Sequence, residues 1–158
     1  MALAMSLAAR AAAIGLSALG TLLLIGQLLS IIAVVTSNDV LYADAAGLCG
    51  SFCHQLPSRC PWVSGSPTVL CFRCIGLYSG VLIGPLVWNR LKVKRLTRLV
   101  LCFATLLPSV IEYALDKFLG QGQAALLRWT TGVLLGAGSI GLLTVLQRRS
   151  PLRHPIGG

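Results

Sequence analysis

The chain has 158 residues, of which 56% are hydrophobic and 11% charged, with a mean hydropathy of +0.83 and a formal net charge of +9. Soluble domains average about 25% charged residues, so this composition excludes an ordinary soluble protein and indicates a membrane protein. A helix needs about 20 apolar residues to cross a bilayer, so the length allows about four spans. We therefore expect one integral membrane domain over residues 1–158.

The first apolar segment extends over about residues 11–35 and follows a single arginine, Arg10. With about 25 residues it is longer than the apolar region of a signal peptide, which has about 7–15, so we interpret it as a retained span. Residues 36–67 then form a polar segment that contains the first cysteines of the central cluster. We expect this segment to be an extracytoplasmic loop.

Three further apolar segments predict spans over about residues 68–88, 99–119 and 126–146. The second of these has glycines at steps of four residues, and so does the last. Such a step places small residues on one helix face, where two helix backbones can approach closely in lipid. The glycines concerned are Gly76, Gly80 and Gly84 in the second span, and Gly132 and Gly136 in the last.

The basic residues lie in short blocks at the ends of these apolar segments. Residues 89–98 contain five Lys or Arg and no acid, and the tail from residue 148 is also basic. Blocks of this kind orient membrane helices with the basic side in the cytoplasm and contact anionic lipid, so we do not expect nucleic-acid binding. The pattern predicts an all-α, four-transmembrane-helix bundle with both termini cytoplasmic, which we expect in a bacterial inner membrane.

Five of the six cysteines lie between Cys49 and Gly80, together with His54. Cys71 and Cys74 have the x2 spacing that brings two thiols to one metal ion, and the loop supplies further candidates. A site of Cys53, His54, Cys71 and Cys74 leaves Cys49 and Cys60 to pair with each other, although adjacent ligands strain a tetrahedron. An all-cysteine site of Cys49, Cys53, Cys71 and Cys74 is the alternative.

Zinc is the first metal we expect at such a site because it favours four-coordinate, thiolate-rich centres, although iron uses the same ligands. Structural disulfides are the second interpretation, since the loop is expected on the oxidising side of the membrane. A third is a thiol-disulfide relay in which Cys71 and Cys74 form the active pair and Arg73 lowers a thiol pKa. Spacing alone does not decide among the three.

Charged residues inside the predicted spans are costly unless they find partners. At 1.5 Å per residue, Arg73 and Glu112 are expected at about the same depth below the outer interface, where they can pair. Asp116 lies one helical turn after Glu112, which makes Arg128 its expected partner. We interpret the four as ion pairs that hold the helices together; a transport path through Arg73, Glu112 and Asp116 is the alternative.

The cysteine region resembles the signature of the domain-of-unknown-function 2085 family of small predicted membrane proteins. The matching residues are Cys53-His54-Gln55, Pro57 and Arg59, then Cys71-Phe72-Arg73-Cys74-Ile75-Gly76-Leu77-Tyr78-Ser79-Gly80, and more weakly Pro108, Asp116, Arg128 and Gly132 to Gly136. The resemblance implies that Cys53, His54, Cys71 and Cys74 are the shared set. Cys60 stands where the family pattern has serine, and the resemblance implies no activity.

From these features we expect a structural metal site that holds the outer loop to the second span. The expected function is an accessory or scaffolding subunit, surrounded by lipid and packed against other subunits of a membrane complex, which could be an energy-converting one. A membrane thiol-disulfide oxidoreductase that uses Cys71 and Cys74 is the alternative function.

Overall fold

The computed structural model describes residues 7–91, 93–119 and 124–147. These are predominantly helical, as predicted. In chain order the elements are α1 (Leu7–Val35), α2 (Asp39–Gly50), the 3-10 turn η1 (Pro57–Arg59), β1 (Trp62–Val63), β2 (Ser66–Pro67), α3 (Phe72–Arg90), α4 (Arg95–Leu119) and α5 (Ala125–Gln147).

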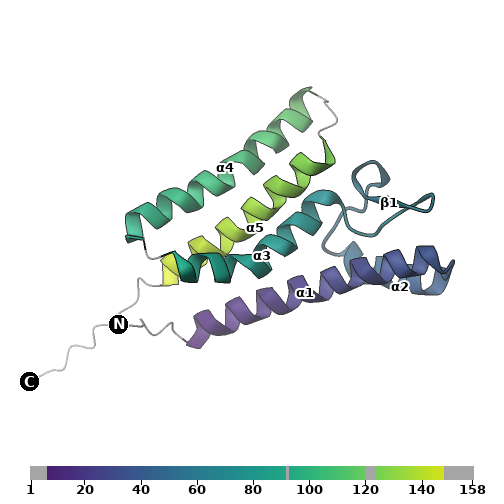
Figure 1. Ribbon diagram of the computed structural model, residues 1–158, viewed down its shortest axis with the longest axis horizontal. Helices are drawn as coiled ribbons and strands as arrows, with labels where there is room; N and C mark the ends of the chain where they lie inside the picture. The colour runs from purple at the N-terminus through teal and green to yellow at the C-terminus, as the bar shows by residue number, and fades with distance from the viewer. Residues whose placement is uncertain (1–6, 92, 120–123, 148–158) are drawn as a thin grey trace, which may run out of the picture.

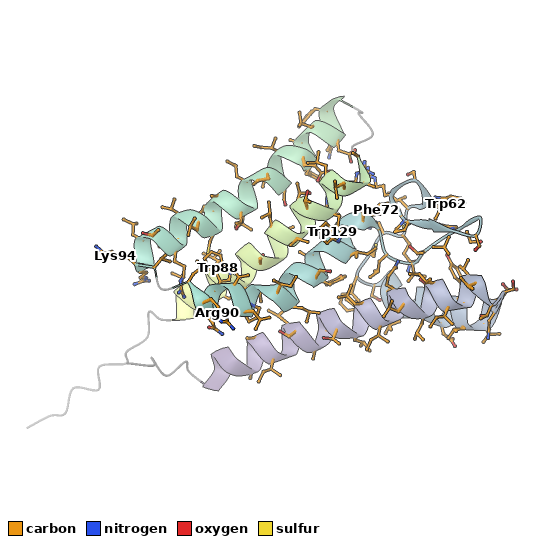
Figure 2. The ribbon with its side chains drawn as sticks, in the orientation of Figure 1. Trp62, Phe72, Trp88, Arg90, Lys94 and Trp129 are labelled. Carbon is orange, nitrogen blue, oxygen red and sulfur yellow. The ribbon has the colours of Figure 1, made fainter. Side chains whose placement is uncertain are left out.

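The four long helices lie side by side in the order α1, α3, α5, α4 (Figure 1). Helix α3 packs chiefly on α5, while α5 also packs on α4, and α1 packs on α2 and α3. The short antiparallel hairpin of β1 and β2 lies with α2 at one end of the molecule. The connection from α3 to α4 lies at the other end, so Arg90 and Lys94 are far from Trp62 of the hairpin (Figure 2).

Three helices in the described part of the chain are long and apolar enough to cross a membrane, over Ala11–Val35, Arg95–Phe118 and Ala125–Val145. The predicted span 68–88 corresponds to α3, which is not among these three. Arg73, Asn89 and several glycines lower the hydropathy of its 19 residues. The structure thus supports three candidate spans where four were predicted.

The segment 36–67 is more ordered than the predicted loop. It contains α2, which begins after Asn38, whose side chain accepts a hydrogen bond from the Leu41 N–H at 3.0 Å. An asparagine at this position is a favourable N-cap, and the alanine-rich sequence that follows favours helix. Beyond it, Ser64 and Gly65 both have positive φ and form the turn of the hairpin.

The predicted glycine faces are the contact between α3 and α5. A Cβ atom at Gly76 would lie 2.1 Å from the Trp129 carbonyl oxygen, and one at Gly80 would lie 2.2 Å from that of Val133. In the opposite direction, a Cβ at Gly136 would lie 2.1 Å from the Leu77 oxygen. No side chain fits between these backbones, so the faces are used inside the protein and are not free for a partner.

Candidate metal centre

The sulfur atoms of Cys53, Cys71 and Cys74 all lie within 4.8 Å of one another. Zinc–sulfur bonds of about 2.3 Å in a tetrahedron place sulfurs about 3.8 Å apart, so the group is close to the size of a metal site. The loop before η1 supplies Cys53, while Cys71 and Cys74 come from the start of α3. The three thiols therefore join the outer segment to a long helix, and they belong to both ligand sets that the spacing left open.

The start of α3 places two of these sulfurs. Cys71 is the N-cap residue, with extended backbone angles, and Cys74 is the third residue of the helix. The first N–H groups of a helix are unpaired and give its N-terminus a partial positive charge, which favours negative charge on the sulfur group. In the metal-free protein this charge lies on Cys53. The N–H of Cys71 donates a hydrogen bond to the Cys53 Sγ at 3.3 Å.

The turn at Gln55 directs a second N–H to the same sulfur. Gln55 has φ +50, a conformation that is costly for a residue with a Cβ atom. This turn lets the Gln55 N–H hydrogen-bond to Cys53, and the Gln55 side-chain amide donates to the Ala46 carbonyl of α2 at 2.8 Å. The strained turn is thus held by α2 and supplies an N–H···S bond of the kind that stabilises a thiolate.

These contacts favour the ionised form of Cys53. Hydrogen bonds from the side chains of Cys71 and Cys74, and then from the backbone N–H groups of Cys71 and Gln55, lower the pKa of Cys53 from 9.0 to about 2 against the effect of burial. Hydrogen bonding to a charged form lowers the pKa of an acid. A sulfur that is already a thiolate is ready to bind a soft metal ion.

A glutamine inside the first apolar helix holds the segment that precedes Cys71. The Gln27 side chain is 5% exposed, and its Oε1 accepts a hydrogen bond from the Leu70 N–H at 2.9 Å. Tyr42 of α2 donates to the Pro67 carbonyl at 2.9 Å and fixes the segment from the other side. Sequence analysis missed this role, although a single glutamine in a long apolar run was a visible signal.

The other predicted ligands lie outside the group of three sulfurs. His54 is exposed and does not belong to that group, although it lines a cavity beside it. The Cys49 thiol points to α1, where it lies 3.9 Å from the Leu23 carbonyl oxygen. Burial, reinforced by the nearby sulfurs of Cys53 and Cys71, raises the pKa of Cys60 to about 12. All six cysteines are described, and each is a free thiol, so a pair between Cys49 and Cys60 stays a prediction.

A cavity of about 280 Å³ lies against the three sulfurs. Its wall consists of the loop from Gly50 to Leu56, the start of α3, and three arginines from different elements. These arginines are Arg59 of η1, Arg73 of α3 and Arg128 of α5. The cavity therefore joins the thiol group to a network of ion pairs.

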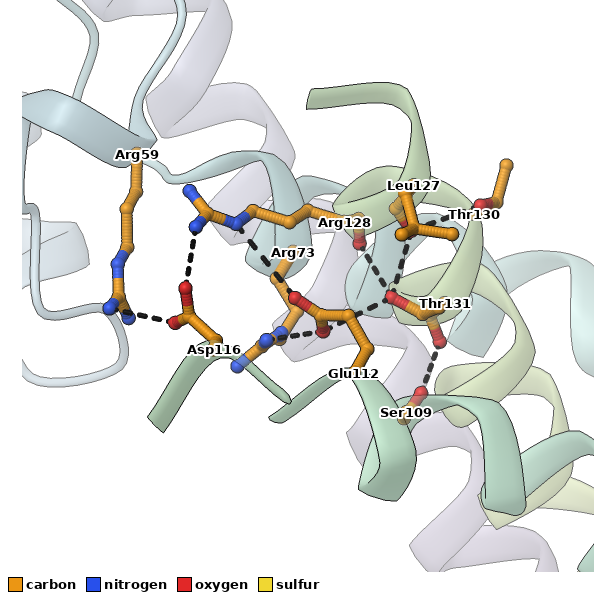
Figure 3. A network of polar contacts seen from close by, with 9 residues as sticks. All are labelled: Arg59, Arg73, Ser109, Glu112, Asp116, Leu127, Arg128, Thr130 and Thr131. Atoms are coloured by element: carbon orange, nitrogen blue, oxygen red, sulfur yellow. Dashed lines mark hydrogen bonds and ion pairs between the residues drawn. The ribbon is translucent and has the colours of Figure 1, made fainter. Parts of the chain in front are cut away.

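This network connects four elements (Figure 3). Arg73 pairs with Glu112, and Arg128 pairs with Asp116 at 3.0 Å. Arg128 also lies 3.8 Å from Glu112, which is 3% exposed. These are the partners expected from helix depth and spacing. Thr131 adds a contact from α5 to Glu112 at 3.5 Å.

Arg59 is an additional member that sequence analysis did not assign. It pairs with Asp116 at 2.8 Å, so Asp116 contacts one arginine of the loop and one of α5. Since Arg59 belongs to the Cys-rich segment, this pair ties that segment to α4. An arginine among the loop cysteines was the available signal, but spacing does not give its partner.

A family model described as "Predicted membrane protein (DUF2085)" matches residues 53–142. This range begins at the first cysteine of the sulfur group and includes every member of the ion-pair network. Among curated proteins, the chain is 40% identical over 40 residues to "Uncharacterized protein MJ1492" of Methanocaldococcus jannaschii. That match covers 25% of this chain and 26% of the relative. No solved structure matches the chain.

Proposed function

This chain belongs to the DUF2085 family of predicted membrane proteins, and we propose that it is a small membrane subunit built around a structural metal site. The observation on which the proposal rests is the convergence of the Cys53, Cys71 and Cys74 sulfurs within 4.8 Å. Metal binding at these sulfurs fixes the extracytoplasmic segment to the start of α3. Zinc is the metal we propose, because it suits closed thiolate sites.

His54 is the fourth ligand in this proposal. It is exposed, adjacent to Cys53 and on the wall of the same cavity, so rotation of its side chain can bring a ring nitrogen toward the sulfurs. Cys49 is the weaker candidate because its thiol faces Leu23 of α1. A set of four protein ligands leaves no open position, which makes the ion structural rather than catalytic.

The position of α3 supports a fourth span. Its 19 residues measure about 28 Å at 1.5 Å per residue, close to the roughly 30 Å of hydrocarbon. It lies alongside α1 and α5, and Gly76, Gly80 and Gly84 are buried on α5. Four spans place the basic α3–α4 connection and the helix ends near both termini in the cytoplasm.

The proposed accessory role rests on a site whose contacts connect helices and loops and whose proposed metal ion has no open position for a substrate. Metal and ion pairs both connect elements, since Glu112 and Asp116 are each in contact with two arginines. This pairing supports a locking role over a transport path for the same residues. We propose that the protein packs against other subunits of a membrane complex through its lipid-exposed helix faces, because its glycine faces are already covered.

Metal content of the purified protein, measured by inductively coupled plasma mass spectrometry, tests the proposal. We expect about one zinc per chain, lost in Cys71→Ser and Cys74→Ser and retained in Cys49→Ser. Purification in mild detergent tests the accessory role. A stoichiometric membrane partner that is lost with the metal in Cys71→Ser supports it, whereas a wild-type protein that carries neither metal nor partner contradicts it.

The ionised Cys53 next to two thiols supports a second candidate, a thiol-disulfide oxidoreductase. In that function Cys71 and Cys74 form a disulfide, and two electrons and two protons pass to a quinone. Two results would favour this candidate over the structural proposal. The purified protein would contain no metal and its thiols would be oxidised by added quinone, and a Cys71→Ser variant would be stable but would have lost this oxidation.

A further inference from the structure

The wall of the cavity beside the sulfurs is rich in hydrogen-bond donors. Three arginines and one histidine line it, and no aspartate or glutamate of the described residues does. Both carboxylates of the ion-pair network, Glu112 and Asp116, lie outside the wall. Among the described residues the wall therefore presents no carboxylate to a ligand, and the negative charge on it is that of the Cys53 thiolate.

The charges of the network do not balance within the described residues. Three guanidinium groups share two carboxylates, because Arg128 contacts both Glu112 and Asp116. Arg59 therefore shares Asp116 with Arg128, and Arg73 shares Glu112 with it. The three guanidinium and two carboxylate groups therefore carry one net positive charge, and the Cys53 thiolate lies on the same cavity wall.

Two buried guanidinium nitrogens of the ion-pair network also lack hydrogen-bond acceptors. They are the Nε atoms of Arg73 and Arg128, and Arg128 is 7% exposed. The contact of Arg128 Nε with Glu112 at 3.8 Å is longer than a hydrogen bond. A buried donor without an acceptor costs free energy, so these arginines have capacity for a further oxygen ligand.

The space is large enough for such a ligand and open to it. A volume of about 280 Å³ is roughly nine times the 30 Å³ that a water occupies in the liquid. Exposed His54 and Leu56 form part of its wall, so a ligand can enter from the surface. The cavity lies at the hairpin end of the helices, which is the level of lipid headgroups if the helices span the membrane.

We propose that this cavity binds an oxyanion of the phosphate class through Arg59, Arg73 and Arg128. Guanidinium groups bind phosphate oxygens through paired, charge-assisted hydrogen bonds, and three of them from three elements surround one site. The phosphate group belongs either to a lipid headgroup or to a free ion. The site uses the arginines, so it stands independently of the metal that we propose at the cysteines.

Arg59→Gln is the test variant, and Lys94→Gln is its matched control. Arg59 is the most exposed of the three arginines, with 38% of its side chain exposed. When Arg59 is replaced, Asp116 still has its ion pair with Arg128, so the variant is expected to fold. Lys94 is exposed at the opposite end, and its variant has the same change of charge. Thermal unfolding in detergent is followed during titration with inorganic phosphate, against chloride at equal ionic strength.

Phosphate is expected to raise the melting temperature of the wild type and of Lys94→Gln. In Arg59→Gln we expect the affinity for phosphate to be lower by about tenfold or more. For the lipid source, the probes are phosphatidylglycerol and the diacylglycerol with the same chains but no phosphate, with retention measured by native mass spectrometry. Stabilisation by inorganic phosphate identifies a free ion. Arg59-dependent retention of phosphatidylglycerol alone identifies a headgroup.

The proposal is overturned if neither probe binds, or if Arg59→Gln and Lys94→Gln weaken binding equally. Metal content is measured on the same samples. A protein with zinc and no phosphate binding would contradict the oxyanion site only, and phosphate binding without zinc would contradict the metal centre only.

Discussion

Cys53 is the residue at which the loop, α2 and α3 meet. Its sulfur receives N–H groups from Cys71 and Gln55 and hydrogen bonds from the thiols of Cys71 and Cys74. The positive φ of Gln55 is a local cost that the fold sustains through the bond from Gln55 to Ala46. Strained backbone conformations are found where a backbone group must point in a particular direction, and here the Gln55 N–H points to the Cys53 sulfur.

The state of Cys53 predicts the number of protons released on metal binding. Hydrogen bonds lower its pKa from 9.0 to about 2, so a metal ion that binds at Cys53 is expected to displace no proton from it at neutral pH. The lowered pKa of Cys53 also stabilises the folded state. This stabilisation is complete above the pKa of the unfolded chain and is lost as the pH falls toward the pKa of the folded state. Hydrogen bonding to Cys53 raises the pKa of Cys71 and of Cys74, so these two thiols are expected to keep their hydrogens.

We therefore expect about two protons released per zinc at neutral pH. Isothermal titration calorimetry of the metal-free protein in buffers of different ionisation enthalpy measures this number. Three protons per zinc would show that Cys53 is a thiol in the metal-free fold.

Gln27 predicts the free energy that α1 contributes to the cysteine segment. Gln27→Leu leaves the buried Leu70 N–H without its acceptor, which is expected to cost about 1–3 kcal/mol. Thermal unfolding in detergent checks the loss, with exposed Thr21→Val on the same helix as control. Equal stability of the two variants would mean that the Gln27 bond does not hold this segment.

At the scale of elements, the close approach of α3 and α5 depends on glycine. Gly80→Ala would place a Cβ 2.2 Å from the Val133 oxygen, whereas nothing lies within 4 Å of a Cβ at Gly15 of α1. Alanine normally favours helix over glycine by up to about 1 kcal/mol. The two substitutions therefore have opposite expected effects.

We expect Gly80→Ala to lower the melting temperature in detergent and Gly15→Ala to leave it equal or higher. The backbones must separate in the first variant, while the second adds only a methyl group exposed to lipid. An unchanged melting temperature for Gly80→Ala would contradict the packing of α3 on α5.

The glycine step predicted faces that allow close helix approach, and the depth of the charges predicted the pair of Arg73 with Glu112, because both follow from helix geometry. Gly76, Gly80 and Gly84 repeat every four residues, and Arg73 and Glu112 lie at similar depths in their helices. The family resemblance was also confirmed by the match over residues 53–142. Local periodicity therefore predicted the four long helices and the ion pairs, but it did not identify α5 as the helix that packs on α3.

Contacts made by irregular segments could not be predicted in the same way. The helix α2, with its N-cap at Asn38, lies in a segment that was predicted as a polar loop. The Arg59–Asp116 pair and the Gln27–Leu70 bond join residues that no periodicity relates. The path of the chain between helices determines which of several cysteines meet, and spacing leaves that path open.

At the scale of the whole molecule, the hairpin and the α3–α4 connection lie at opposite ends. If α3 crosses the bilayer, Ser64 of the hairpin and Lys94 of the connection lie on opposite sides of it. We expect Ser64→Cys to react with a membrane-impermeant maleimide added outside intact cells, and Lys94→Cys to react only after permeabilisation. The labelling of each is compared with that of the wild type.

Both engineered cysteines reacting from the same side would contradict the fourth span and leave the three candidate spans alone. The three are Ala11–Val35, Arg95–Phe118 and Ala125–Val145. The basic connection would then share a side with the cysteines, against the distribution of charge along the chain.

The coordination of the bound metal tests the central claim most directly, and X-ray absorption at the zinc edge of the purified protein measures it. The sulfur group of Cys53, Cys71 and Cys74 with His54 predicts three sulfurs at about 2.3 Å and one nitrogen at about 2.0–2.1 Å. A shell of four sulfurs would mean that the fourth ligand is another cysteine and not His54. A shell of oxygen and nitrogen without sulfur would contradict a metal centre at these cysteines.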